Sequence, residues 1–368
     1  MMPALNFGPA LSLLTNLRTS SLQPFRAWAR TTQKRVRPPC CREHAGMESR
    51  ERARLLREGN ACEAQLATIL REPGRGRSPT IVLGGFVPDA VDQVFLLRRL
   101  LLRSGDVYYI KYPRERFSLP LLCAQLDDLV EELSSQGCAP VLFGVSFGAG
   151  IALEWLRRGN RTARLGALVL VSPVACLADV IDPTSAKPAT LLGRALLPYL
   201  EAEKPVTDAS VEKSRLVFRR MFEAGAQNKT ALRQLMSVQD IGRIRDSVTA
   251  SIREITTLGS LERVRALTSM PPLTDGFSAQ LAPLTEAPAL VLFAEREEAV
   301  LDPHSPTRFA LDRATRAYLP NGRVENVLAR PGDAPVQHAS LVFHVVDFLP
   351  HLETFYREVR QAGLAIAA

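Results

Sequence analysis

One serine in the sequence has the neighbours that a nucleophile requires. The segment Gly144-Val145-Ser146-Phe147-Gly148 follows the pattern G-x-S-x-G, with an apolar run before it and an amphipathic run after it. In a nucleophile elbow the serine occupies a strained turn between a strand and a helix, and small residues two positions before and after it make room for that turn. The pattern predicts Ser146 as a nucleophile; the alternative is a glycine-rich turn with an ordinary serine.

A nucleophilic serine needs a base, because its hydroxyl group is a poor nucleophile until the proton is removed. The sequence contains five histidines: His44, His304, His338, His344 and His351. Only His338 lies in a loop between the last predicted strand and the terminal helical stretch, where the fold order of such enzymes places the base. We therefore predict His338 as the base. His344 and His351 fall inside the helical stretch and are interpreted as a packing and a surface residue.

The base in turn needs a carboxylate that fixes its tautomer and stabilises its positive charge. Candidates follow two of the predicted strands: Glu295, Glu297, Glu298 and Asp302 after one, and Asp179 after the other. Their types and positions alone leave the choice open.

The chain from about residue 79 to 364 resembles the α/β-hydrolase fold family, on the serine motif and the order of serine, acid and histidine along the chain. Members commonly carry G-x-x-D after the penultimate strand. Alignment on Ala294 and Val300 puts Glu297 at the position of that aspartate, and Ala294 where the glycine usually stands. The resemblance thus implies a triad of Ser146, Glu297 and His338, with Glu298, Asp302 and Asp179 as the alternative acids.

The resemblance also implies two N–H donors for the negatively charged oxygen of a tetrahedral intermediate. One is the Phe147 N–H, directly after the nucleophile at the head of a helix, where the helix dipole favours negative charge. The other lies in the segment IVLGGFVPDA, which is similar to the H-G-x turn of the family with Gly84 in place of the histidine. Gly85 would allow the sharp turn and Phe86 would supply the N–H; the alternative is a plain turn between a strand and a helix.

Short apolar runs alternate with longer amphipathic ones from residue 79 onward, which is typical of a parallel sheet covered by helices. Strands are expected at Thr80–Gly84, Val107–Tyr112, Pro140–Gly144, Ala167–Ser172, Ala289–Phe293 and Val324–Ala329. Helices are expected at Val91–Ser104, Leu119–Gln136, Phe147–Arg158, Pro306–Tyr318 and Ala339–Gln361. The predicted fold class is α/β, with a doubly wound, mostly parallel sheet flanked by helices.

The alternation breaks between the fourth and fifth of these strands. Residues 174–286 contain helical patterns and no convincing strand, and they are far too long for an ordinary connection. We predict that they form an inserted helical lid. The other boundaries follow: a basic segment at 1–46, a helix and linker at 47–78, and a hydrolase core at 79–173 and 287–368.

The net charge of +8 lies at the N-terminus. Residues 1–78 contain 14 Lys and Arg against 6 Asp and Glu, whereas the remainder contains 32 of each kind. Residues 79–368 therefore have no net charge, which argues against a nucleic-acid-binding groove, because such a groove needs clustered basic side chains. The first 42 residues have no acid, so residues 1–46 are interpreted as a transit peptide, a disordered basic tail, or sequence upstream of a true start at Met47. We expect a chain that starts at Met47 to fold and to stay active.

Other features restrict the compartment and the cofactors. Six scattered cysteines show no CxxC or Cys/His spacing, which argues against a zinc site or a disulfide framework and favours a reducing compartment. No apolar run approaches the 18 or so residues that a membrane-spanning helix needs. No P-loop is present, and no G-x-G-x-x-G follows the first strand, so we expect no cofactor and no metal. The expected location is the cytoplasm, or an organelle if residues 1–46 are a transit peptide.

The function that these residues indicate is hydrolysis of an ester-like bond, either a carboxylic ester or a thioester, through an acyl-Ser146 intermediate. The expected partner is a small-molecule acyl substrate; the sequence does not indicate its identity or the oligomeric state. Two alternatives stay open. An acyltransferase would use the same acyl-enzyme with another acceptor, and a non-catalytic relative would only bind a ligand or partner.

Overall fold

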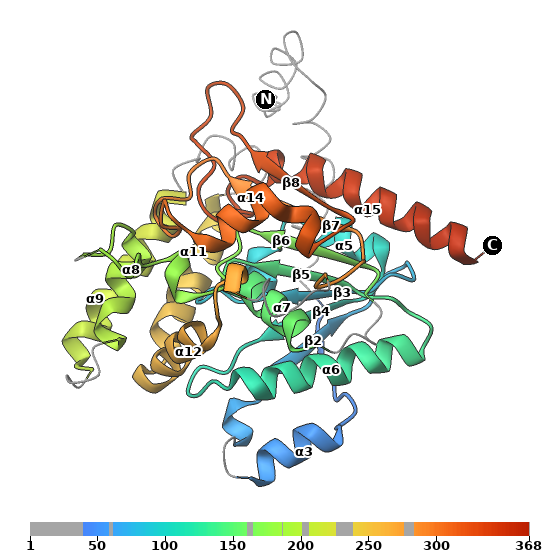
Figure 1. Ribbon diagram of the computed structural model, residues 1–368, viewed down its shortest axis with the longest axis horizontal. Coiled ribbons are helices and arrows are strands. Elements are labelled where there is room, and N and C mark those ends of the chain that lie inside the picture. Colours follow the sequence, from blue (N-terminus) through green and yellow to red (C-terminus); the bar gives the residue numbers. More distant parts are fainter. Residues whose placement is uncertain are drawn as a thin grey trace, which may run out of the picture.

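Eight strands form one sheet at the centre of the computed structural model (Figure 1). The structure describes residues 40–58, 62–159, 165–185, 187–200, 206–225, 238–275 and 283–367. The strands are β1 (Arg42–Glu43), β2 (Thr68–Glu72), β3 (Thr80–Leu83), β4 (Val107–Lys111), β5 (Val141–Val145), β6 (Ala167–Val171), β7 (Ala289–Ala294) and β8 (Gly322–Val327). Their order across the sheet is β1-β2-β4-β3-β5-β6-β7-β8.

The sheet is parallel from β4 to β8, and only its N-terminal edge is antiparallel. There β2 pairs with β4, and the short β1 pairs with β2. Strands β3, β5, β6 and β7 have only buried residues, because helices cover both faces of the parallel part. This explains why they are continuous apolar runs rather than alternating ones, and it confirms the predicted mostly parallel, doubly wound sheet.

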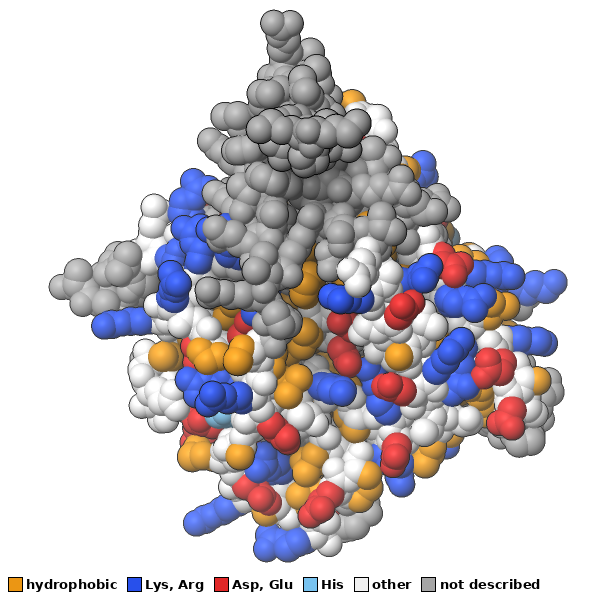
Figure 2. Space-filling view, turned by 180° about the vertical axis from the view of Figure 1, so that it is seen from behind, with side chains coloured by type: hydrophobic (Ala, Val, Ile, Leu, Met, Phe, Trp, Pro, Cys, Tyr) orange, Lys and Arg blue, Asp and Glu red, His pale blue; other side chains and the backbone are white. Residues whose placement is uncertain are grey.

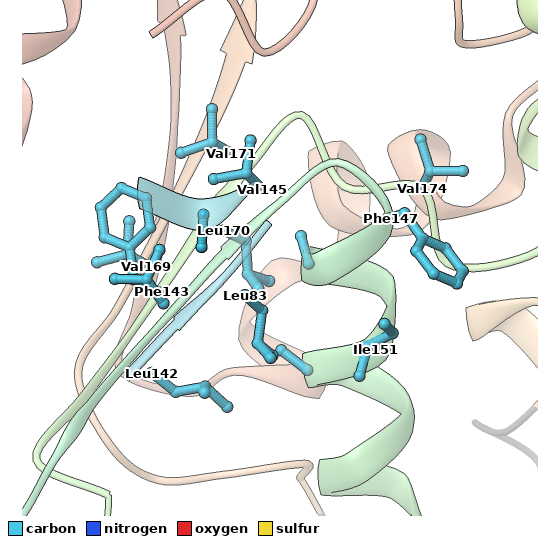
Figure 3. Packing of buried hydrophobic residues seen from close by; sticks show 14 of the residues in the cluster. Leu83, Leu142, Phe143, Val145, Phe147, Ile151, Val169, Leu170, Val171 and Val174 are labelled. Atoms are coloured by element: carbon cyan, nitrogen blue, oxygen red, sulfur yellow. The ribbon is translucent and has the colours of Figure 1, made fainter. Parts of the chain in front are cut away.

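Helices α6, α7 and α14 lie on one face of the sheet, and α5 and α15 lie on the other (Figure 1). Outside the insertion the helices are α3 (Arg50–Arg57), α4 (Ala90–Gln93), α5 (Arg98–Ser104), α6 (Leu119–Ser135), α7 (Phe147–Arg158), α14 (Pro306–Tyr318) and α15 (Val345–Ala367). Figure 3 shows α7 beside the central strands, with Leu83 on the side of the helix that faces them. Phe147 and Ile151 lie on the other side of the helix, where the Phe147 ring packs against the rings of Phe86 and Tyr112. The start of α7 is thereby fixed against the carboxyl ends of the strands.

Residues 174–286, here called the insertion, contain helices and no strand among their described residues. Among the described residues of the insertion are the 3-10 turns Leu177–Asp179 and Leu197–Tyr199 and the helices α8 (Leu191–Leu196), α9 (Asp208–Gly225), α11 (Val238–Glu254) and α12 (Thr257–Ser269). The four helices gather at one end of the molecule in Figure 1. The Ser247 hydroxyl donates to Asp92 Oδ2 at 2.8 Å, and Arg114 Nη2 donates to the Ser251 hydroxyl at 3.0 Å. These bonds connect α11 to the core.

Two expected helices differ from the structure. The stretch predicted as one helix at Val91–Ser104 is divided into α4 and α5, with the buried Val94 and Leu97 in the turn between them. The terminal helix starts at Val345 instead of Ala339, because Ala339 has a φ of +51°, which no α-helix permits.

The N-terminal edge strands were missed by the sequence analysis. Strand β2 lies inside a stretch interpreted as helical, and β1 lies inside the segment interpreted as a tail. The expectation that residues 1–46 stay outside the fold is therefore wrong for residues 40–46. Residues 1–39 lie outside the part of the chain that the structure describes. The His44 N–H donates to the Ile69 carbonyl at 2.8 Å, and His44 Nε2 lies 3.2 Å from Glu132 Oε2.

We now expect truncation at Met47 to destabilise the protein, which revises the expectation from the sequence. Loss of β1 and of the His44 contacts exposes the edge of β2, and a cost of about 1 kcal/mol lowers the melting temperature by about 1–2 °C in a chain of this size. Calorimetry of chains 40–368 and 47–368 measures the difference. Equal melting temperatures would show that β1 contributes nothing to stability.

The face of the molecule shown in Figure 2 carries Lys and Arg side chains interspersed with Asp and Glu. Elsewhere among the described residues, basic side chains also form ion pairs, such as Arg323 with Glu358 at 2.7 Å and Arg71 with Asp106 at 2.6 Å. None of the described helices combines the length and the apolar character that would let it cross a bilayer.

Candidate active site

Ser146 lies in the tight turn between β5 and α7. Its φ is +53°, which is strained for a residue with a side chain. The turn needs the flanking glycines because a Cβ on Gly144 would lie 2.5 Å from Ala149 Cα, and one on Gly148 would lie 2.4 Å from the Gly84 carbonyl oxygen. The Ser146 N–H donates to the Val171 carbonyl at 2.8 Å, which holds the turn against β6. This geometry is that of a nucleophile elbow.

A chain of hydrogen bonds links Ser146 to a buried carboxylate. Ser146 Oγ lies 2.9 Å from His338 Nε2, and His338 Nδ1 is in hydrogen-bond contact with Glu297 Oε2. The side chains of His338 and Glu297 are only 8% and 2% exposed, so solvent does not screen the interaction between them. The imidazole can therefore accept a proton from the serine while the carboxylate stabilises the resulting charge.

The loops that carry Glu297 and His338 meet beyond the end of the sheet. Arg296 pairs with Gln337 in an isolated parallel bridge, and the Arg296 N–H donates to the Val336 carbonyl at 2.9 Å. Each bridge residue directly precedes one of the two site residues. The backbone contact thus sets the spacing of carboxylate and imidazole.

Ser172 supports the site and was missed by the sequence analysis. Its hydroxyl donates to Glu297 Oε1 at 2.7 Å and accepts the Ala339 N–H at 3.2 Å. The Ala294 N–H also donates to Glu297 Oε1, at 2.6 Å. The two donors leave Oε2 for the imidazole. The available signal was that Ser172 directly follows a buried strand, at the sheet edge where the carboxyl ends of the parallel strands meet.

Backbone strain is concentrated around these side chains. Ser146, Ser172 and Ala339 have φ values of 53°, 47° and 51°, and they are the non-glycine residues with positive φ in the described part of the chain. All three belong to the hydrogen-bonded group around His338. Strain of this kind persists only where surrounding contacts impose it, and it collects at functional sites.

The other predicted carboxylates lie elsewhere. Glu298 is exposed and lies 3.4 Å from Arg296 Nη1. Asp302 is buried, and its Oδ1 accepts the His304 N–H at 2.9 Å. Asp179 is fully buried: it accepts the Ala175 N–H and the Ser305 hydroxyl, at 2.8 and 2.7 Å. Of the predicted acids, only Glu297 contacts His338.

His344 directly precedes α15, and His351 lies within it. His344 is buried, and its ring nitrogens contact Ser340 Oγ at 3.0 Å and the Ala334 carbonyl at 3.2 Å. Burial lowers the pKa of His344. His351 is partly exposed and pairs with Glu325. Of these three histidines, only His338 contacts Ser146.

The two predicted oxyanion donors lie beside Ser146. Phe86 follows the end of β3, Phe147 follows the serine, and their rings pack with a centroid distance of 5.3 Å. Within the described part of the chain neither N–H donates to another residue, whereas the Gly85 N–H is occupied by Gln93 Oε1 at 2.8 Å. The Phe86 N–H is therefore the donor that this turn can offer to a ligand.

A fully buried arginine from the insertion holds the same turn. Arg263, on α12, donates to the Phe86 carbonyl and, at 3.0 Å, to the Pro113 carbonyl. The rings of Phe86, Tyr112 and Phe117 surround its guanidinium at 5.6–6.0 Å. Burial, followed by repulsion from Arg114, lowers the pKa of Arg263 to about 9.

A cavity of about 150 Å³ opens onto Ser146 and His338. The insertion supplies much of its apolar lining, with Phe218, Met221 and Phe222 from α9 and Ile244, Val248 and Ile252 from α11. Asp92 and Gln93 add polar groups to the lining. No group of three or more metal-binding side chains occurs among the described residues.

No protein-family model matches the sequence, and no curated protein matches it. Several solved structures are similar to this one. The esterase RhEst1 from Rhodococcus sp. ECU1013 is 13% identical, with a TM-score of 0.55 over 87% of this chain and 99% of that one. MenH from S. aureus is 16% identical, with a TM-score of 0.53 over 79% and 98%. The epoxide hydrolase of Bacillus megaterium is 12% identical, with a TM-score of 0.51 over 79% and 97%.

The structural similarity shows a shared fold, and identities this low leave the substrate open. These neighbours have the α/β-hydrolase fold, which the resemblance at Ser146 implied. The strand order, the parallel sheet with an antiparallel edge and the helices on both faces agree with it. The chain has the α/β-hydrolase fold.

Proposed function

We propose that the protein is a serine hydrolase that cleaves an ester-like bond through an acyl-Ser146 intermediate. The observation that carries the proposal is the hydrogen-bonded series Ser146, His338 and Glu297, which opens onto an apolar cavity. Esterases among the structures of similar fold support this reaction class.

In the first half of the reaction His338 Nε2 removes the proton of the Ser146 hydroxyl as Oγ attacks the carbonyl carbon of the substrate. The carbonyl oxygen becomes an oxyanion, which the N–H groups of Phe86 and Phe147 stabilise. The intermediate then collapses: the bond to the leaving alcohol or thiol breaks, and His338 returns the proton to that group. The acyl group stays on Oγ.

In the second half a water molecule takes the place of the leaving group. His338 removes its proton, the hydroxide attacks the acyl carbon, and the second intermediate releases the carboxylic acid while Oγ regains its proton. Glu297 remains ionised throughout and stabilises the imidazolium in both halves. Its two other donors, Ser172 and the Ala294 N–H, keep the carboxylate in place.

The insertion acts as a lid in this proposal. Its side chains from α9 and α11 enclose the space next to the nucleophile, so the acyl group of the substrate is expected to be apolar. A charged acyl chain would lose its hydration against these walls without gaining a partner. The small volume favours short and medium acyl chains over long ones.

The test is to trap the acyl-enzyme. Brief incubation with 4-nitrophenyl butyrate, an acid quench and peptide mass spectrometry should show a butyryl group on Ser146, and 4-nitrophenyl palmitate should react more slowly. Alcohols added to the reaction show which acceptor takes the acyl group. If a low concentration of alcohol receives most of it, the protein is an acyltransferase and not a hydrolase. If no ester acylates Ser146 or is turned over, the protein is instead a non-catalytic relative that only binds a ligand or partner.

A further inference from the structure

The side chain of Gln93 caps the turn that carries the proposed oxyanion donor. Gln93, the last residue of α4, accepts the Gly85 N–H on Oε1 at 2.8 Å. A backbone N–H can only donate, so the atom that faces it must be the amide oxygen. This bond fixes the orientation of the amide. The NH2 group then points away from the Gly85 nitrogen.

The NH2 group lies on the side of Gly85 that faces the nucleophile. A Cβ placed on Gly85 would be 2.9 Å from Gln93 Nε2 and 3.7 Å from Ser146 Cβ. Gly85, Gln93 and Ser146 all line the same cavity. The absence of a side chain at position 85 therefore leaves room for the amide nitrogen and a substrate beside the serine.

Gln93 Nε2 has no acceptor among the described residues, although it can donate two hydrogen bonds. The lining of this cavity is mostly apolar and includes Phe218, Ile244 and Val248 from the insertion. A donor held in a fixed orientation against such walls gains a hydrogen bond only from water or from a ligand. A bound ester offers its carbonyl oxygen, which lies next to Ser146 in the reactive position.

We infer that Gln93 Nε2 is a third donor to the substrate carbonyl oxygen, beside the N–H groups of Phe86 and Phe147. The inference rests on the proposed hydrolase function and adds a catalytic residue to it. The carbonyl oxygen gains charge in the tetrahedral intermediate, so a donor fixed in advance strengthens its bond as the reaction proceeds. Loss of one side-chain donor of this kind lowers kcat by about 10²–10³-fold.

The test compares two variants with two substrates. Gln93→Glu keeps an oxygen that accepts the Gly85 N–H and removes the NH2 donor, whereas Gln93→Met removes both functions without adding charge. Each is assayed with a 4-nitrophenyl ester and with the matching thionoester, in which sulfur replaces the carbonyl oxygen. Sulfur is a weak hydrogen-bond acceptor, so the thionoester gains little from the donor in the wild-type protein.

We expect Gln93→Glu to keep the wild-type melting temperature and to lose about 100-fold in kcat on the ester, with little change in KM. The preference for the ester over the thionoester should fall at least about tenfold in both variants. Repulsion by the new carboxylate, or a displaced turn, would slow both substrates alike and leave that preference unchanged.

An unchanged preference in both variants, or full ester activity in Gln93→Glu, would overturn the inference and reduce Gln93 to a structural role. Failure of the hydrolase proposal looks different, because the wild-type protein itself would then form no acyl-Ser146. If Gln93→Met does not fold, the preference measured in Gln93→Glu decides the question alone.

Discussion

Ser146→Ala should abolish covalent labelling by a fluorophosphonate and lower the hydrolysis of short acyl nitrophenyl esters by about 10⁶-fold, as when a triad serine is removed. The reason is that His338 Nε2 has Ser146 Oγ as its partner at 2.9 Å, and alanine leaves the base with no nucleophile to activate. Labelling is measured by mass spectrometry of the intact protein, and turnover by release of nitrophenolate.

Ser172→Ala is the matched control for this experiment. Ser172 also follows a buried strand and has a positive φ, but its hydroxyl contacts Glu297 rather than His338. We expect this variant to be labelled at Ser146, more slowly than the wild type, because the carboxylate loses one of its two other donors. Labelling that persists in Ser146→Ala would contradict the assignment of the nucleophile.

Glu297→Gln should lower kcat by about 10⁴-fold while leaving the fold intact. The amide has nearly the shape of the carboxylate but no charge to stabilise the imidazolium. Its NH2 group could also donate to His338 Nδ1, which would put the proton of the neutral ring on Nε2, where it blocks removal of the serine proton. The kinetic constants and the melting temperature are measured together.

Glu298→Gln and Asp302→Asn are the controls for the acid. Glu298 is exposed beside Arg296, so its change should be nearly silent. Asp302 is buried and accepts the His304 N–H, so its change should affect stability more than kcat. If Asp302→Asn were the inactive variant and Glu297→Gln the active one, the choice of the acid would be wrong.

The parallel part of the sheet and the positions of Ser146, Glu297 and His338 could be predicted because they depend on local patterns and on chain order. Each buried strand is a short apolar run with a turn at its end, and the elbow adds two glycines with a specific spacing. The choice of Glu297 among neighbouring carboxylates came from the resemblance. Its physical basis lies in the folded chain, where the contact between Arg296 and Gln337 brings Glu297 to His338.

The missed features depend on contacts between distant residues. Strand β1 has two residues, both exposed, and only its pairing with β2 makes it a strand. The helix before the C-terminus starts late because Ala339 donates to Ser172, which is 167 positions earlier in the chain. Gln93 and Arg263 look like ordinary helix residues in the sequence, since their partners Gly85 and Phe86 belong to another element.

Arg263 makes the insertion and the core depend on each other. Its cation is solvated by the carbonyls of Phe86 and Pro113 and by three rings, all of which belong to the core, while its own helix belongs to the insertion. Removal of residues 174–286 would leave those carbonyls and rings without their partner, and an insertion transplanted from another protein of this fold would have to bring an equivalent cation. In the proposed mechanism substrate preference therefore cannot be exchanged as a module, because the segment that would enclose the substrate also shapes the turn that would bind the carbonyl oxygen.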